Sequence, residues 1–143
     1  MAESFLEAIR REVGRFQNRG FLEAVMAVAA LAAMADDEYG IAEKYRAEEL
    51  LSEIPVFDVF DLSEAMEIMG EDIHALRTDR PAAVRDLEAR VRAFANVPDK
   101  ARTLLRTAHA IITCDGDITT AERAEFERLA RLLKQDIAAL ALG

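Results

Sequence analysis

Apolar residues recur along almost the whole chain with the spacing of an α-helix rather than that of a strand. A helix-spaced stripe near the amino terminus predicts a first amphipathic helix, and its members are Phe5, Leu6, Ile9, Val13 and Phe16. Gly20 is expected to separate it from a second, alanine-rich helix that runs from Phe21 to about Ala35. No segment alternates polar and apolar residues long enough to predict a strand.

Capping and breaking residues mark the later helices. Asp61 and Glu64 have the spacing of a capping box, and Pro81 and Pro98 suit the first turn of a helix. These signals predict five further helices, which run from about 42 to 53, from 61 to about 76, from 79 onward, from 98 to about 114 and from 120 to about 134. We therefore predict a single all-α domain over residues 1–143 with seven helices, and "DIAALAL" as a short last turn.

Composition narrows the class of protein. The 27 acidic residues outnumber the 18 basic ones, and a formal charge of -9 disfavours binding to nucleic acid, whose phosphates would repel the chain. The single cysteine, Cys114, forms no disulfide within the chain, which fits a reducing compartment. The longest apolar run, Ala24–Ala35, is shorter than the roughly 20 residues that span a bilayer. With an acidic amino terminus unlike a signal peptide, a cytoplasmic protein without membrane insertion is expected.

An internal repeat relates two distant parts of the chain. The stretch "AALAAMADDEYGIAEKYRAEELL", residues 29–51, aligns without a gap with "AHAIITCDGDITTAERAEFERLA", residues 108–130. Asp36 then stands opposite Asp115, and Glu43 stands opposite Glu122. Each copy reads as an apolar helix, an acidic turn and an amphipathic helix, and the two units span about 21–53 and 98–134.

The second acidic turn resembles two known loops but fits neither. "DGDIT" matches the DxDxT nucleophile loop of haloacid-dehalogenase-like phosphatases, yet here it follows a predicted helix near the carboxyl end of a short chain. An EF-hand would need glycine where Thr120 stands and glutamate where Phe126 stands. His74, His109 and Cys114 do not readily supply the three or four ligands of a zinc site. No nucleophile motif or glycine-rich phosphate loop is present, so no enzyme is predicted.

The acidic turns are the candidate functional sites. Asp36 and Asp115 each follow an apolar helix, at the end where the helix dipole disfavours negative charge. Closely spaced carboxylates are ligands for Ca²⁺, Mg²⁺ or Mn²⁺ rather than for Zn²⁺. The alternative is an exposed turn in which the aspartates bind the backbone and water screens their charge. The candidate ligands are Asp36, Asp37, Glu43, Asp115, Asp117 and Glu122.

The two glutamates of this set also have a purely structural interpretation. Glu43 and Glu122 fall in the first turn of their predicted helices, where a carboxylate gains about 0.3–1 kcal/mol from the helix dipole. Thr119 and Glu122 have the spacing of a capping box, which explains Glu122 without any metal. Both interpretations stay open for these residues.

Three stretches together carry a resemblance to a known family. They are "VGRFQNRGFLEAVMAVAALAAMADDE", "VFDVFDLSEAMEIM" and "AHAIITCDGDITTAERAEFERLARLL", which lie between Val13 and Leu133. The chain resembles the tellurite-resistance protein TerB and its TerB-like relatives. The resemblance implies a compact helical domain with internal pseudo-symmetry, a role in tellurite and stress response, and a divalent-metal site in the acidic turns. It also implies association with other Ter proteins, including the membrane protein TerC.

One turn departs from the pattern of this family. The first turn reads Asp36-Asp37-Glu38 where the family usually has Asp-Gly, so Asp36 carries over more directly than Asp37.

Two alternatives to a metal-binding protein remain. One is a metal-independent helical interaction scaffold, and the other is an enzyme with paired carboxylates whose pKa values are pushed apart. The segment "VFDVF", residues 56–60, is expected to cap the core or to form an apolar patch for a partner.

Overall fold

A computed structural model describes residues 19–35, 41–52, 62–113 and 118–137 of the chain. This part contains helices and no strand, which confirms the all-α fold class. Each described helix begins within about two residues of its expected position, and each helix end that the sequence predicts lies within the same margin. The helices are α2 (Arg19–Ala33), α3 (Ile41–Ser52), α4 (Leu62–Thr78), α5 (Arg80–Arg92), α6 (Pro98–Thr113) and α7 (Thr120–Leu132). The predicted first helix and the segment "VFDVF" lie outside the described residues.

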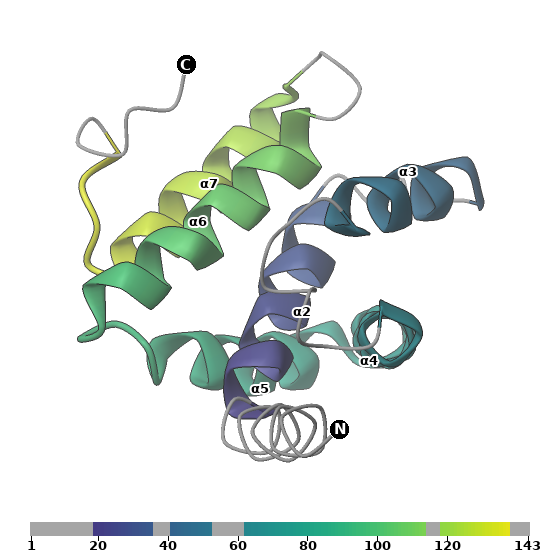
Figure 1. Cartoon of the computed structure of the whole chain (residues 1–143), viewed down its shortest axis with the longest axis horizontal. Helices are drawn as coiled ribbons and strands as arrows, with labels where there is room; N and C mark the ends of the chain where they lie inside the picture. Colours follow the sequence, from purple (N-terminus) through teal and green to yellow (C-terminus); the bar gives the residue numbers. More distant parts are fainter. Residues whose placement is uncertain (1–18, 36–40, 53–61, 114–117, 138–143) are drawn as a thin grey trace, which may run out of the picture.

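Helix α2 forms the centre of the fold. It packs against α4, α5, α6 and α7, and Figure 1 shows these helices arranged around it. Eleven of its fifteen residues are buried, because the helix is apolar on every side. Although α2 is the most apolar helix, none of the described helices has the length and hydropathy needed to cross a membrane.

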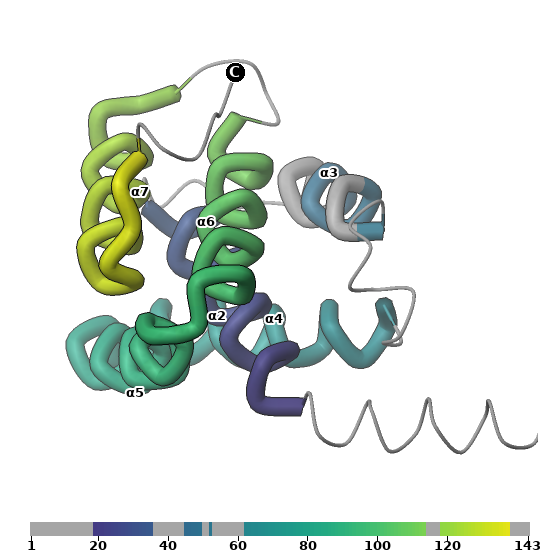
Figure 2. The backbone as a smooth tube through the Cα atoms, turned by 60° about the vertical axis from the view of Figure 1, so that its left-hand side comes forward, coloured from purple at the N-terminus to yellow at the C-terminus, as the bar shows by residue number. Residues whose placement is uncertain are grey.

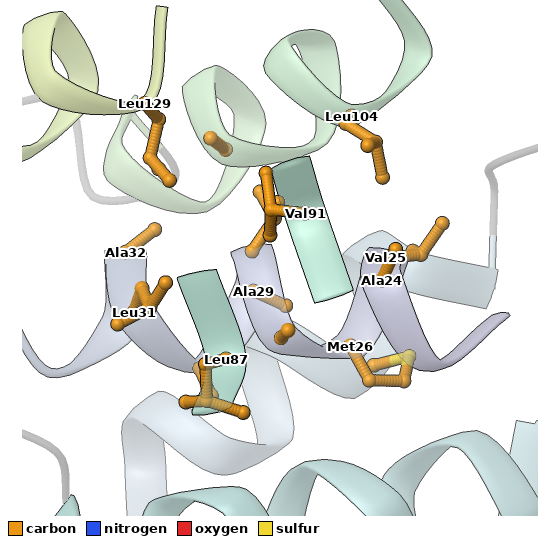
Figure 3. Close-up of a cluster of buried hydrophobic side chains, with 14 of the residues drawn as sticks. Ala24, Val25, Met26, Ala29, Leu31, Ala32, Leu87, Val91, Leu104 and Leu129 are labelled. Atoms are coloured by element: carbon orange, nitrogen blue, oxygen red, sulfur yellow. The ribbon is translucent and has the colours of Figure 1, made fainter. Parts of the chain in front are cut away.

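The core forms where larger side chains meet the small residues of α2. Leu87 and Val91 from α5, Leu104 from α6 and Leu129 from α7 converge on Ala24, Ala29 and their neighbours, as Figure 3 shows. The four larger side chains are at most 1% exposed. Alanine at these positions of α2 allows the surrounding helices to approach closely. Helices α6 and α7 lie side by side in both overall views (Figures 1 and 2), and α3 contacts α4 and α6.

Local signals placed most helix starts correctly, with one exception. The side chain of Asp79 accepts a hydrogen bond from the backbone N–H of Ala82 at 3.4 Å, and proline occupies the first turn of α5 as expected. The prediction that Gly20 separates two helices is wrong, because Gly20 lies inside the first turn of α2. A glycine costs little at this exposed end, where no neighbouring atom crowds the position of a β-carbon.

The two units of the internal repeat contact each other through their helices. Helix α3 contacts α6, and α7 contacts α2, so the second helix of each unit packs on the first helix of the other. The surroundings of the two first helices nevertheless differ. Helix α2 is enclosed on all sides, whereas α6 is amphipathic and buries seven of its sixteen residues. The structural equivalence of the two units therefore stays a prediction.

Two ion pairs hold carboxylates in the interior. Asp72 on α4 is 5% exposed, and its Oδ1 lies 3.1 Å from Nη1 of Arg90 on α5. The same guanidinium reaches Oδ2 of Asp86 at 2.7 Å. Glu88, which is also buried, pairs with Arg128 on α7. These pairs join α4 to α5 and α5 to α7.

Candidate functional site

The structure describes only part of the predicted metal-ligand set. Asp36, Asp37, Asp115 and Asp117 lie outside the described residues. Glu43 lies in the first turn of α3, and its side chain is not among those described. Glu122 at the start of α7 is described. Among the described side chains, no group of three or more His, Cys, Asp or Glu residues is placed to hold a metal ion.

Glu122 forms the predicted capping box with Thr119. The backbone N–H of Thr119 donates to Oε1 of Glu122 at 2.9 Å, and the backbone N–H of Glu122 donates to Oγ1 of Thr119 at 3.1 Å. The glutamate is 9% exposed, so its carboxylate is held in a buried position at the start of α7. The capping role is therefore confirmed, while the role of Glu122 as a metal ligand stays a prediction.

Replacing Thr119 by alanine should lower the free energy of unfolding by about 0.5–2 kcal/mol, because the first turn of α7 loses its side-chain acceptor. Chemical denaturation of the purified protein measures this change. Thr120→Ala is the matched control, since Thr120 is exposed and lies inside the helix. Equal losses in the two variants would contradict the capping role.

An arginine lies at the carboxyl end of α2, just before the first acidic segment. Nη2 of Arg80 donates to the backbone carbonyl of Met34 at 2.9 Å. A cation in this position interacts favourably with the helix dipole. The chain itself therefore supplies positive charge at the end of α2, where the sequence pattern had suggested a metal ion.

The same arginine lines a small cavity between α2, α4, α5 and α7. The cavity has a volume of about 120 Å³, and its polar lining residues are Arg80, Glu125 and Arg128. Burial raises the pKa of the Glu125 carboxyl; Arg128 and Arg80 lower it, and Glu88 raises it further. Two arginines and one glutamate thus line this cavity, and Arg128 also pairs with the buried Glu88.

A second, larger cavity forms a groove between α6 and α7. We call it the α6–α7 groove; it has a volume of about 280 Å³ and is lined by His109, Ile112, Ile118, Arg123, Phe126, Glu127 and Ile137. Ile118 is 43% exposed and Ile137 is 37% exposed, so apolar surface reaches solvent here. The ring of His109 packs against that of Phe126, with centroids 5.8 Å apart.

Sequence reasoning missed both the groove and the buried ion pairs, although weak signals exist. Ile118 is an isolated apolar residue in the polar stretch "DGDITT", which is unusual for a fully solvated turn. Asp72 occupies a position in the apolar stripe of α4 between Met69 and Leu76, which indicates a buried charge with a partner. His74, in contrast, is exposed, as a surface role predicts.

These features define a small all-helical domain in which acidic segments follow α2 and α6. The model of the family described as tellurite resistance protein TerB matches residues 22–142, and the chain belongs to this family. The tellurium resistance protein TerB of an Alcaligenes species is 27% identical over 100 residues, which cover 70% of this chain and 82% of the relative. No solved structure matches the chain. The family predicted from the sequence is thereby confirmed.

Proposed function

We propose that this chain is a cytoplasmic TerB-type protein of the tellurite and stress response that works by binding rather than by catalysis. It binds a divalent cation, Ca²⁺, Mg²⁺ or Mn²⁺, through its acidic turns and docks other Ter proteins, including the membrane protein TerC. Membership of the TerB family supports the role in resistance. The ligand set is Asp36, Asp37, Glu43, Asp115, Asp117 and Glu122.

The position of Glu122 is the observation that supports a metal site. Its carboxylate is buried, fixed by the capping box, and follows Asp115 and Asp117 by a few residues. A carboxylate offers about four acceptor positions, so the hydrogen bond from Thr119 leaves capacity for a cation. Capping and metal binding are therefore compatible roles for the same side chain.

Electrostatics favours the second acidic turn over the first. Helix α6 has no basic residue in its last turn. The negative end of its dipole, which Asp115 and Asp117 follow in the sequence, is therefore not offset by a positive side chain of the same helix. Helix α2 also lacks a basic residue in its last turn, but Arg80 on α5 donates a hydrogen bond to the backbone carbonyl of Met34, directly after α2. A cation that bridges Asp115 and Glu122 would tie the end of α6 to the start of α7 and set the shape of a docking surface.

The second candidate function is a metal-independent interaction scaffold. The capping box and the contact between Arg80 and Met34 favour it, because each stabilises a helix end next to an acidic segment without a metal ion. In such a scaffold the aspartates serve only as turns and caps. Docking would then depend on the helical surface alone.

Thermal unfolding of chelator-treated protein with added Ca²⁺, Mg²⁺, Mn²⁺ or Zn²⁺ separates the two functions. A cation that binds only the folded state stabilises it by about 2.7 kcal/mol at a hundred times its dissociation constant, which raises the midpoint by several degrees. We expect Ca²⁺, Mg²⁺ or Mn²⁺ to raise the midpoint of the natural protein. The Asp36→Asn/Asp115→Asn variant should not respond.

The matched control for this experiment is Glu49→Gln/Glu67→Gln, which removes the same charge from exposed positions on α3 and α4. This control should respond to the cation as the natural protein does. If no cation shifts the natural protein at millimolar concentration, the metal site is excluded and the scaffold remains. Co-purification with co-expressed TerC, with and without chelator, then shows whether docking needs the cation.

A further inference from the structure

The cavity between α2, α4, α5 and α7 combines charged side chains with an apolar wall. Its volume of about 120 Å³ is several times the roughly 30 Å³ that one water molecule occupies, so it can hold a molecule of a few non-hydrogen atoms. Its polar lining residues are Arg80 on α5 and Glu125 and Arg128 on α7. Among the described residues, the other lining side chains are apolar, and they are Leu31, Met34, Leu76 and Val84.

Both arginines are held at this cavity by other parts of the chain. Nη2 of Arg80 donates to the backbone carbonyl of Met34 at 2.9 Å, and this bond offsets the negative end of the α2 dipole, which opposes an anion. Arg128 pairs with Glu88, which is only 9% exposed. A guanidinium carries five N–H groups in a planar fork that matches an oxyanion, so it can keep such a partner and bind an anion as well.

Glu125 determines the net charge at the cavity. Arg80 and Arg128 carry two positive charges, Glu88 offsets one of them, and an ionised Glu125 offsets the other. Burial raises the pKa of the Glu125 carboxyl, and the charges of Arg128 and Arg80 act against this, so both guanidinium groups lie near the same carboxyl group. Glu88 raises this pKa further. Once protonated, Glu125 leaves one positive charge without compensation and can donate a hydrogen bond.

We propose that this cavity binds a small oxyanion between Arg80 and Arg128, and that Glu125 takes up a proton from solvent when the anion binds. The guanidinium groups bind oxygen atoms of the anion, and the neutral carboxyl group donates to another. Sulfate, phosphate and tellurite share this chemistry. The site does not depend on a divalent cation in the acidic turns, and only the choice of tellurite as a probe rests on the proposed function.

Titration with sulfate at constant ionic strength, with chloride as the balancing anion, tests the binding step. Sulfate keeps the same charge around neutral pH, so a pH dependence of its binding comes from the protein. Calorimetry of the full chain should show saturable binding at one site. The affinity should rise as the pH is lowered, by up to about tenfold per pH unit, because an anion beside Glu125 raises the pKa of this carboxyl and one proton enters with it. Absence of saturable binding for sulfate, phosphate and tellurite would overturn the proposal.

Glu125→Gln separates an anion site from a purely structural cluster. This variant should bind sulfate about tenfold more tightly than the natural protein at neutral pH and should lose the pH dependence, because it lacks the carboxylate that repels the anion. Impaired folding does not produce such a gain. The control is Glu127→Gln, which removes the same charge from an exposed residue of α7 that lines the α6–α7 groove instead. Equal affinities of Glu125→Gln and Glu127→Gln would contradict the proposal.

Arg80→Gln tests the positive side of the cavity. Glutamine can still donate a hydrogen bond to the carbonyl of Met34 but carries no charge, so sulfate binding should weaken by roughly tenfold. Arg123→Gln is the matched control, since Arg123 is exposed on α7 and lines the α6–α7 groove. Equal weakening in both variants would overturn the proposal, because it would reflect the net charge of the chain rather than this cavity.

The comparison of the three anions identifies the source of the ligand. Tighter binding of tellurite than of sulfate and phosphate supports a site that serves the resistance function, whereas similar affinities support a general oxyanion site. The thermal-shift experiment with divalent cations can be run without these anions. Failure of the oxyanion site is therefore distinguishable from failure of the cation site.

Discussion

Replacing Arg90 by methionine should lower the free energy of unfolding by about 3–5 kcal/mol near pH 7, because a buried charge loses its partner. Asp72 is 5% exposed between α4 and α5, and Arg90 both donates hydrogen bonds to it and neutralises it. Methionine keeps most of the volume of the arginine stem but leaves the carboxylate without a counter-charge. Urea denaturation followed by circular dichroism measures the loss.

The loss should depend on pH in a defined direction. Burial raises the pKa of Asp72 above its usual value, while Arg90 acts to lower it, so the variant should raise this pKa further. A carboxyl group whose pKa is higher in the folded state stabilises that state at low pH, and this contribution is lost as the pH rises through the folded pKa. The deficit of Arg90→Met should therefore shrink as the pH is lowered, because the carboxyl group, whose pKa is raised in the folded state, takes up its proton. A deficit that stays constant between pH 4 and pH 7 would contradict this explanation.

The partner variant provides the matched control. The side chain of Arg90 is 30% exposed and also contacts Asp86, so in Asp72→Leu it still has solvent and a second carboxylate. We expect Asp72→Leu to cost less than Arg90→Met. The double variant should recover a large part of the loss, since replacing both members of a buried pair by apolar residues is often close to neutral. Additive losses would show that the two residues do not act as a pair.

Replacing Leu104 by alanine should lower the free energy of unfolding by about 2.7–5 kcal/mol. Leu104 on α6 is fully buried and points toward α2 (Figure 3). The loss has two parts, the transfer free energy of the removed methyl and methylene groups and the cavity that remains. For a domain of this size it should lower the thermal midpoint by roughly 10 °C.

The composition of α2 explains why this cavity should persist. Figure 3 labels Ala24, beside Val25, on the part of α2 below Leu104, and the single methyl group of this alanine cannot reorient to fill a space. Leu132→Ala is the matched control, because Leu132 on α7 is only partly buried and should lose less. Calorimetry of both variants measures the difference, and a Leu104→Ala loss no larger than that of Leu132→Ala would contradict the expectation.

The sequence by itself determined the helices and the family of this protein. Helical periodicity predicted all six described helices, and short-range capping signals such as Asp79 before α5 and Thr119 before α7 placed their starts. These signals succeed because each depends on residues within one or two turns of each other. The one local failure, Gly20, reflects the low cost of glycine in an exposed first turn rather than a missing helix.

Only the tertiary structure decided which distant residues meet. The pair of Arg90 and Asp72 spans 18 residues, that of Arg128 and Glu88 spans 40, and Arg80 binds the carbonyl of Met34 across 46. The α6–α7 groove likewise depends on the reversal at Lys134, which brings Ile137 back beside Phe126. Such contacts have no local signature, because they follow from how the helices pack around the small side chains of α2 rather than from any short stretch of sequence.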